Sequence, residues 1–317
     1  MSHELKNNSI WDEQDRLTSR KNALWLRARM VQAIRLYFIK HDYLEVETPH
    51  IIPAPAPEVH INAISAGKNY LHTSPELCMK RLLAAGYSRI FQLSKCFREG
   101  ERGNLHLPEF TLLEWYRTGI DYKALMAECE KLIVFVSKNI GTGERIYYHD
   151  SEIDLRSPWE KMSVNNAFDR YASLPLQKSL KNGLFDELMA MEIEPKLGAT
   201  KPTFLYDYPA SLASLARLKH DKRQLAERFE VYIGGVELAN GFSELTDPEE
   251  QRSRFKRDQQ NRHNDGKNVY PMPEKFLNSL EHMPEAAGIA LGVDRLTMLF
   301  ADKTRIDDVV SFTPEEL

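Results

Sequence analysis

The chain has 317 residues, of which 42% are hydrophobic and 28% charged, and its formal net charge is −4. These values are typical of a soluble globular protein with one large core, and the acidic balance argues against broad, charge-driven binding of nucleic acid. The three cysteines lie at neither metal-binding nor paired spacings, which predicts free thiols in a reducing compartment. No secretory leader or membrane-spanning run is evident, so we expect a cytoplasmic protein.

The first part of the chain predicts a polar arm followed by a helix and a short strand. Residues 1–17 are expected to form a loosely held arm in front of one domain over residues 18–317. A helix is predicted to start near Thr18 or Ser19, either of which could serve as its N-cap. It carries apolar residues at helical spacing and is followed by a predicted strand over residues 43–47 that runs into Pro49. Another helix is predicted through residues 79–85, with Ser74 as its N-cap and Pro75 at the first helical position.

Residues 89–117 predict two strands joined by a long polar loop. Arg98 closes the first strand, and a Pro-Glu-Phe sequence opens the second. Alternation along the second strand places one set of side chains on a common face: Phe110, Leu112, Glu114 and Tyr116. A buried carboxylate needs a partner, so this face suits a site that binds a phosphate or an amine better than it suits a core.

Residues 230–245 predict a β-hairpin that turns at Gly234 and Gly235. If Ile233 pairs with Val236, then Tyr232 opposes Glu237, and Glu230 lies on the same face. Two carboxylates so close require a proton or a cation between them, and Mg²⁺ would suit such a pair. The alternative is an exposed hairpin with solvated glutamates. Helices are expected over residues 121–140 and 164–171, and a strand over residues 203–208.

Residues 288–295 predict a glycine-containing strand that enters a helix. Gly292 allows close approach of the backbone, and Arg295 falls in the first turn of the helix. A basic side chain is unfavourable there because of the helix dipole, so a phosphate partner is expected.

These segments together resemble motifs 1, 2 and 3 of the class II aminoacyl-tRNA synthetases, in the lysyl-type branch, over residues 18–312. The resemblance implies an α+β fold with a mixed, mainly antiparallel sheet flanked by helices, and a homodimer built through motif 1. It also implies ATP and Mg²⁺ as cofactors, with Arg98 and Arg295 as catalytic residues on the phosphates and Phe110 against the adenine.

The resemblance carries three sets of site residues onto this chain. The residues expected to bind ATP are Arg98, Glu99, Gly100, Glu101, His106, Leu107, Phe110, Glu237, Leu238, Gly292 and Arg295. The residues expected to bind the amino-acid substrate are Ser74, Glu76, Glu114, Tyr116, Glu244 and Ala290, with Glu244 on the side-chain ammonium. The expected metal ligands are Glu230 and Glu237. Gly100 and Leu107 depart from the family pattern, which usually has an acid and an asparagine at these places.

Only about 17 residues precede motif 1, so no anticodon-binding domain is expected. In this the chain is similar to a family of truncated lysyl-tRNA synthetase paralogues, the elongation factor P–(R)-β-lysine ligases (EpmA, PoxA or GenX). That similarity implies an AMP-forming ligase that transfers (R)-β-lysine or lysine to elongation factor P, a protein of translation, with no tRNA and no membrane as partner. Ala290 agrees with it, because lysyl-tRNA synthetases usually have glycine there.

Three alternatives remain open: an amide-forming enzyme resembling asparagine synthetase A, a minimal lysyl-tRNA synthetase-like enzyme, and a catalytically dead regulatory subunit. The acidic set of Glu114, Tyr116 and Glu244 argues against the first, since an aspartate substrate would need a basic pocket. The presence of both arginines and both metal acids argues against the third.

Overall fold

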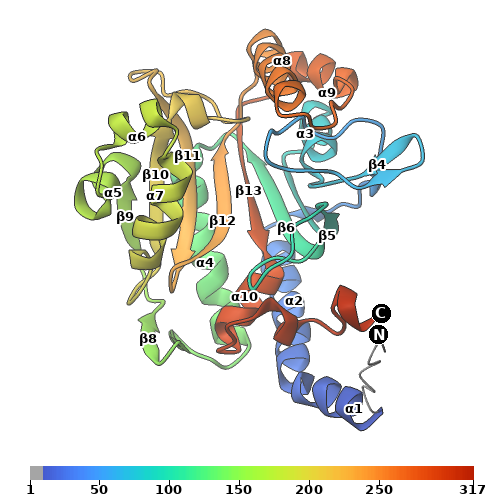
Figure 1. The fold of residues 1–317 in the computed structure, drawn as a ribbon, viewed down its shortest axis with the longest axis vertical. Coiled ribbons are helices and arrows are strands. Elements are labelled where there is room, and N and C mark those ends of the chain that lie inside the picture. The colour runs from blue at the N-terminus through green and yellow to red at the C-terminus, as the bar shows by residue number, and fades with distance from the viewer. Residues whose placement is uncertain (1–9) are drawn as a thin grey trace, which may run out of the picture.

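An eight-stranded mixed sheet forms the centre of the molecule in the computed structural model, which describes residues 10–317 (Figure 1). The strand order is β1-β5-β6-β13-β12-β11-β10-β9. Neighbours are antiparallel except at the two ends of the sheet, where β1 runs parallel to β5 and β9 runs parallel to β10. The strands are β1 (Leu44–Glu45), β5 (Arg89–Phe97), β6 (Glu109–Thr118), β9 (Glu160–Ser163), β10 (Thr203–Pro209), β11 (Leu225–Ile233), β12 (Val236–Ser243) and β13 (Ala286–Gly292).

Two smaller sheets lie outside the central one. β2 (Ile51–Ile52), β4 (Asn69–Leu71) and β3 (Ser65–Ala66) form a three-stranded sheet, and β7 (Arg145–Tyr148) pairs with β8 (Ser151–Asp154). The predicted α+β class with a mixed, mainly antiparallel sheet is therefore confirmed.

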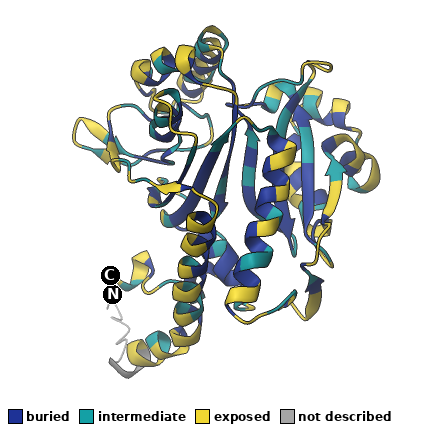
Figure 2. Ribbon diagram, turned by 180° about the vertical axis from the view of Figure 1, so that it is seen from behind, coloured by how far each residue is buried: buried dark blue, intermediate teal, exposed yellow. Residues whose placement is uncertain are grey.

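One face of the central sheet is covered by α2 (Lys21–Lys40), α4 (Tyr122–Asn139) and α10 (Val293–Phe300). Seen from behind, the helices are buried on the side toward the sheet and exposed on the other (Figure 2). Phe38 of α2 stacks on Phe91 of β5 with ring centroids 4.5 Å apart, and it also contacts Trp115 of β6. The apolar face of each helix therefore packs on the strand face that carries Leu113 and Trp115, and this packing is the main core.

Two further groups of helices lie on the other face of the sheet (Figure 1). A second core joins α3 (Glu76–Ala84), α8 (Pro248–Asn264), α9 (Glu274–Ser279) and the 3₁₀ turn Leu280–His282. A third core, next to β9 and β10, contains α5 (Val164–Tyr171), α6 (Leu176–Asn182), α7 (Phe185–Leu188) and the π-turn Met189–Ile193. Short 3₁₀ turns cover Glu194–Lys196, Ala210–Leu212, Ile306–Val309 and Pro314–Glu316. The helices predicted over residues 121–140 and 164–171 and the strand predicted over residues 203–208 are confirmed.

The N-terminal prediction needs correction. Helix α1 (Ile10–Ser19) already occupies part of the predicted arm of residues 1–17, while residues 1–9 lie outside the described residues. Helix α2 begins at Lys21 with Arg20 at its N-cap and no side-chain cap, so the prediction of Thr18 or Ser19 as the cap was wrong. Both residues end a helix instead of starting one, and the Ser19 hydroxyl donates to the carbonyl of Arg16 at 2.7 Å. The strand predicted over residues 43–47 is reduced to the two residues of β1.

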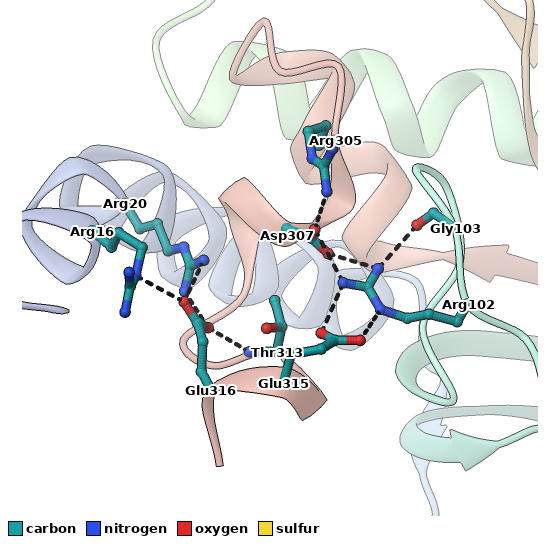
Figure 3. Close-up of polar contacts among 9 residues, drawn as sticks. All are labelled: Arg16, Arg20, Arg102, Gly103, Arg305, Asp307, Thr313, Glu315 and Glu316. Atoms are coloured by element: carbon teal, nitrogen blue, oxygen red, sulfur yellow. Dashed lines mark hydrogen bonds and ion pairs between the residues drawn. The ribbon is translucent and has the colours of Figure 1, made fainter. Parts of the chain in front are cut away.

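The C-terminal segment is fastened to the rest of the chain by ion pairs (Figure 3). Arg20 donates to both carboxylate oxygens of Glu316, at 2.8 and 2.9 Å. Arg102, in the loop after β5, donates to both oxygens of Glu315, at 2.8 and 2.9 Å, and also contacts Asp307. The end of the chain thus touches both the first helices and the loop beside the sheet. Within residues 10–317, no helix combines the length and the apolar character needed to cross a membrane.

Candidate active site

The uncovered face of the sheet forms the floor of a cavity of about 620 Å³. Its walls come from the loop after β5, from α3, from α8 and from the start of α10. Most of the predicted site residues line it: Ser74, Glu76, Arg98, Glu101, His106, Leu107, Phe110, Glu114, Tyr116, Glu237, Leu238, Ala290, Gly292 and Arg295. Glu99, Gly100, Glu230 and Glu244 lie outside this lining.

The side chains of strand β6 point alternately toward the cavity and toward the main core. Phe110, Leu112, Glu114 and Tyr116 face the cavity, as predicted. Leu113 and Trp115 point the other way and are fully buried in the main core. Glu114 pairs with Ala290 of β13 in register. The central strands therefore present one carboxylate and one phenol on the cavity floor.

The amino-acid end of the cavity is organised around Glu114, whose carboxylate accepts from the Ser74 hydroxyl at 2.5 Å and from the Tyr116 hydroxyl at 2.7 Å. Burial, with the charge of Glu76 as a smaller cause, raises the pKa of Glu114 to about 7. Ser74 also accepts from the backbone N–H of Glu76 at 3.0 Å, although α3 begins at Glu76, one residue later than predicted. A buried carboxylate with a raised pKa is a strong attractor for a ligand ammonium group.

Glu244 lies behind this end of the cavity and is 1% exposed. The resemblance assigns it to a substrate ammonium, but in this structure Glu244 Oε2 lies 2.5 Å from the Nζ atom of Lys80, a residue that we did not predict. Burial raises the pKa of Glu244 to about 8, and the charge of Lys80 opposes that rise. The i,i+4 spacing of Glu76 and Lys80 on α3 predicts an ion pair between them, but the contact of Lys80 with Glu244 depends on the tertiary fold.

Gly288 on β13 lines the cavity between Tyr116 and Glu244. A Cβ atom added to it would lie 2.2 Å from the Tyr116 ring and 2.7 Å from Glu244 Oε1. Only glycine therefore fits between these two side chains. This residue was also missed as a functional position, although it opens the glycine-containing segment that we had singled out.

The other end of the cavity contains Arg98. Its guanidinium lies 4.9 Å from the centroid of the Phe110 ring, and its Nη1 atom is 3.6 Å from Glu101. Its Nε atom is buried and has no hydrogen-bond partner in the described part of the chain, residues 10–317. A buried guanidinium nitrogen without an acceptor is unfavourable, so an oxyanion such as a phosphate or a carboxylate fits this position.

Arg295 joins helix α10 to strand β12 and to the loop after β5. It donates to the backbone carbonyl of Glu237 at 2.7 Å and to that of Leu105 at 3.2 Å. Its Nη2 atom is 2.6 Å from Nε2 of His106. Burial, together with the charge of Arg295, lowers the pKa of His106, so at neutral pH the imidazole can accept this hydrogen bond.

Asp294, next to Arg295, ties helix α2 to the cavity. Its two carboxylate oxygens accept from the Arg27 guanidinium at 3.0 Å and from the backbone N–H of Thr111 at 2.7 Å. Arg27 also donates to the Thr111 hydroxyl at 2.7 Å. The three segments that carry the resemblance are thus held together at one point.

The two departures from the family pattern have structural explanations. Gly100 has φ 79°, a backbone conformation that favours glycine over an acidic residue. Leu107 is 4% exposed and packs in the main core. The side chain of Glu99 is outside the cavity lining, and its backbone N–H donates to the carbonyl of Asn62 at 2.8 Å.

The predicted hairpin register is confirmed at the turn, where Ile233 pairs with Val236 and Tyr232 with Glu237. One step further the register shifts, so that Glu230 opposes Asn240. Glu230 is 8% exposed, which excludes the alternative that this glutamate is solvated on an exposed hairpin. Its carboxylate accepts hydrogen bonds from three side chains at 2.5 to 2.7 Å: Tyr208, Arg228 and Tyr232.

The carboxylates near the hairpin offer a limited fit to a metal ion. Burial raises the pKa of Glu230, and the nearby charge of Glu237 adds to the rise while Arg228 opposes it. Burial and the same two glutamates raise the pKa of Glu194 to about 7. Among residues 10–317, no group of three or more acidic, histidine or cysteine side chains could hold a metal ion. Mg²⁺ needs only one or two carboxylates when phosphates complete its shell. Glu237 offers one to the cavity, with one oxygen 3.3 Å from Arg295, whereas both oxygens of Glu230 accept shorter hydrogen bonds.

The fold and the cavity define the catalytic domain of a class II synthetase: residues 4–316 match the family model of the class II tRNA synthetases (D, K and N), and the chain belongs to this family. Within it, the chain is 42% identical to the elongation factor P–(R)-β-lysine ligase of Proteus mirabilis, over 90% of this chain and 93% of the relative. It is 40% identical to the ligases with the same name from Vibrio cholerae, over the same shares, and Pectobacterium atrosepticum, over 91% of this chain and 94% of the relative.

Proposed function

We propose that this protein is an ATP-dependent ligase that activates (R)-β-lysine or lysine as an adenylate and transfers it to a lysine side chain of elongation factor P. One observation carries the proposal. A single cavity joins an arginine with an unpartnered buried nitrogen, Arg98, to a buried acidic end formed by Glu76 and Glu114. The names of the relatives support the same activity.

The acidic end suits the ammonium groups of the amino acid. Glu76 and Glu114 line the cavity, Tyr116 donates to Glu114, and Glu244 lies directly behind them. Charge-assisted hydrogen bonds from ammonium groups would offset the desolvation of these carboxylates. Ala290 lies on the floor beside Glu114, where its methyl group would favour a β-amino acid over an α-amino acid.

The basic end suits ATP and the substrate carboxylate. Arg98 offers its free Nε atom to an oxyanion, and Arg295 lies across the cavity, held by His106 and Glu237. Phe110 supplies an aromatic surface, although the Arg98 guanidinium already stacks on it. Glu237 is the side chain that would hold Mg²⁺ together with the phosphates, and Glu230 would join it only by giving up a donor such as Arg228. When bound, the ion would neutralise charge on the phosphates.

The chemistry requires little acid–base catalysis. The carboxylate oxygen of the amino acid attacks the α-phosphorus of ATP, and the bond to pyrophosphate breaks. Arg98 and Arg295 would stabilise the charge that develops on the phosphoryl oxygens. The amine of the acceptor lysine then attacks the carbonyl carbon of the adenylate, AMP leaves, and the amine loses a proton. We assign no side chain as the base for this second step.

The partners follow from the same proposal. The acceptor is elongation factor P, and a protein that modifies a translation factor would work in the cytoplasm. The exposed face of α2, where Trp25 is 64% exposed and Ile39 63% exposed, suits a homodimer contact built by the motif 1 helix. Of the alternative activities, a minimal tRNA-charging enzyme or an asparagine synthetase A-like enzyme is less favoured, because the relatives are named as elongation factor P ligases.

The test is the intact mass of purified, unmodified elongation factor P after incubation with this protein, ATP, Mg²⁺ and either (R)-β-lysine or L-α-lysine. We expect a gain of one lysyl unit that is larger with the β-isomer. A parallel reaction with tRNA in place of the protein acceptor tests the charging alternative. Transfer to tRNA without any gain on elongation factor P would overturn the proposal.

A further inference from the structure

A lysine ammonium group is buried behind the acidic end of the cavity. Lys80 of α3 is 1% exposed. Its Nζ atom lies 2.5 Å from Glu76 Oε1 and 2.5 Å from Glu244 Oε2. The ammonium also lies 4.9 Å from the centroid of the Phe242 ring and 6.0 Å from that of Phe276. Two carboxylates and two aromatic rings therefore fix the position of this charge.

Three carboxylates share this end of the site. Glu76 and Glu244 contact Lys80, while Glu114 is held by neutral hydroxyl groups. Glu76 raises the pKa of Glu114, and both of them raise the pKa of Glu244, so the three negative charges act on one another. Within residues 10–317, Lys80 is their one direct cationic contact, so the cluster has two uncompensated negative charges when all three acids are ionised.

One oxygen of Glu244 has no donor among residues 10–317. Its Oε1 atom is buried without a hydrogen-bond partner and faces Gly288, which lines the cavity. Lys80 thus satisfies only one side of this carboxylate. A buried carboxylate oxygen that is left without a donor on the cavity side is unfavourable, and a ligand ammonium group is the donor that fits it.

We propose that Lys80 is a specificity-determining residue: as a fixed counter-cation it sets the charge of the pocket, so that the pocket accepts an amino acid with two ammonium groups. This inference rests on the proposed function and deepens it. Two ligand ammonium groups compensate the two remaining negative charges, and the ligand carboxylate goes to Arg98. An amino acid with one ammonium group leaves a buried carboxylate uncompensated. Lys80 acts through the glutamates and does not touch the reacting atoms.

The first variant is Lys80→Met, which keeps the length of the side chain and removes its charge. Three carboxylates without a counter-cation repel one another more strongly, so they retain protons to higher pH. In ATP–pyrophosphate exchange we expect the KM for the lysine isomer that the wild type uses to rise at least about tenfold at pH 7.5, with a smaller change in kcat. We also expect the pH at which KM is halfway between its limits to rise by at least about one unit.

The second variant is Lys80→Met combined with Glu76→Gln, which removes one positive and one negative charge and restores the original balance. We expect its pH midpoint to return close to that of the wild type, while its KM stays raised because Glu76 itself lines the amino-acid end of the cavity. A purely structural role for Lys80 predicts that the free energy of unfolding changes while the pH midpoint of KM stays at the wild-type value in both variants. The double variant carries one buried carboxylate fewer than Lys80→Met, so it keeps the test open if the single variant does not fold.

Lys219→Met is the matched control, because Lys219 forms a largely buried ion pair with Asp207 at 2.8 Å outside the cavity lining. The KM of this control variant for the lysine isomer should equal that of the wild type. Exchange by the wild type with either lysine isomer is required first, and its absence with both would contradict the proposed function itself. If the wild type exchanges, an unchanged KM or an unchanged pH midpoint in Lys80→Met would overturn the role of Lys80. A double variant whose pH midpoint does not return toward the wild-type value, or one that is also unfolded, would overturn it as well.

Discussion

Arg102 and Glu315 form a bidentate ion pair that joins the loop after β5 to the end of the chain, with both N–O distances at or below 2.9 Å. Asp307 contacts the same guanidinium at 3.0 Å, and the backbone N–H of Ile306 donates to the carbonyl of Asn104 in that loop at 2.8 Å. The loop that carries His106 into the cavity is thus held by residues near the C-terminus (Figure 3).

Glu315→Gln should therefore loosen this loop. Because exposed ion pairs contribute little individually, we expect the KM for ATP in pyrophosphate exchange to rise only about three- to fivefold, with the KM for the amino acid unchanged. Glu152→Gln is a suitable control, since Glu152 forms an exposed ion pair with Arg145 on the distant β7–β8 hairpin. If the KM for ATP is the same in Glu315→Gln as in Glu152→Gln, the C-terminal contact does not position the loop.

Arg98→Ala should abolish adenylate formation while the fold survives. Arg98 lines the cavity and has a buried Nε atom without a protein partner, so its removal costs no protein hydrogen bond at that atom. The expected loss in pyrophosphate exchange is at least about a hundredfold, as for other groups that stabilise developing charge. Thermal unfolding of the variant checks the fold, and exchange at the wild-type rate would contradict the assignment.

The unliganded protein should become less stable as the pH rises from 7 to 8.5. The folded pKa values of Glu114 and Glu194 are about 7 and that of Glu244 is about 8, all well above the unfolded value of about 4.3. The folded state therefore binds more protons than the unfolded state in this range, and stability falls with pH by at most about 1.4 kcal/mol per unit for each proton. The histidines with lowered pKa values, His72 and His106, act below this window.

Urea unfolding at pH 7.0, 7.75 and 8.5 would measure this slope. Glu244→Gln should make this slope shallower, because the amide cannot titrate, while Glu114 and Glu194 still contribute. A stability that stays constant or rises with pH in the wild type would mean that these carboxyl groups are already ionised at pH 7.

Gly288→Ala should damage the site rather than the fold. The added methyl group would meet the Tyr116 ring and Glu244 Oε1 on the cavity side, and we expect the kcat/KM for the amino acid to fall at least about tenfold. Gly241→Ala is an informative comparison, since its methyl group would meet Phe229 and Ile289 on the core side. That variant should lose about 1–3 kcal/mol of unfolding free energy from overpacking. Unchanged substrate kinetics in Gly288→Ala would contradict the placement of the substrate there.

Ala290→Gly should shift the preference of the enzyme toward L-α-lysine. Ala290 lines the cavity next to Glu114 in the sheet register, and one methyl group in a binding pocket discriminates by about 1–3 kcal/mol. The ratio of kcat/KM values for (R)-β-lysine and L-α-lysine should therefore fall about tenfold or more in pyrophosphate exchange. A ratio that does not change would assign the selection of the isomer to another residue.

Features with a short period along the chain were predictable from the sequence. The alternation of Phe110, Leu112, Glu114 and Tyr116 on β6 and the pairing of Tyr232 with Glu237 follow from the geometry of one strand or one tight turn. The cap prediction at Thr18 and Ser19 failed because a helix already precedes them, and local sequence does not distinguish the end of one helix from the start of the next.

The partners of the buried charges were not predictable in the same way. Lys80 and Glu244 are 164 positions apart and meet only because α3 packs beside the central strands. Arg228 is close to Glu230 in sequence. The two side chains are buried as an ion pair only because Tyr208 and Tyr232 also surround the Glu230 carboxylate. The identity of an acid can be read from the sequence, whereas the choice between a protein cation and a ligand cation is made by the tertiary structure.

The raised pKa values of Glu114 and Glu244 have a consequence for calorimetry. Near neutral pH these carboxyl groups are partly protonated in the unliganded pocket, and a ligand that brings ammonium groups displaces those protons into the solvent. The heat of amino-acid binding will therefore include the heat with which the buffer takes up the released protons. Titrations in phosphate and in Tris at the same pH will give different apparent enthalpies, and the slope against the ionisation enthalpy of the buffer will count the protons that leave the pocket.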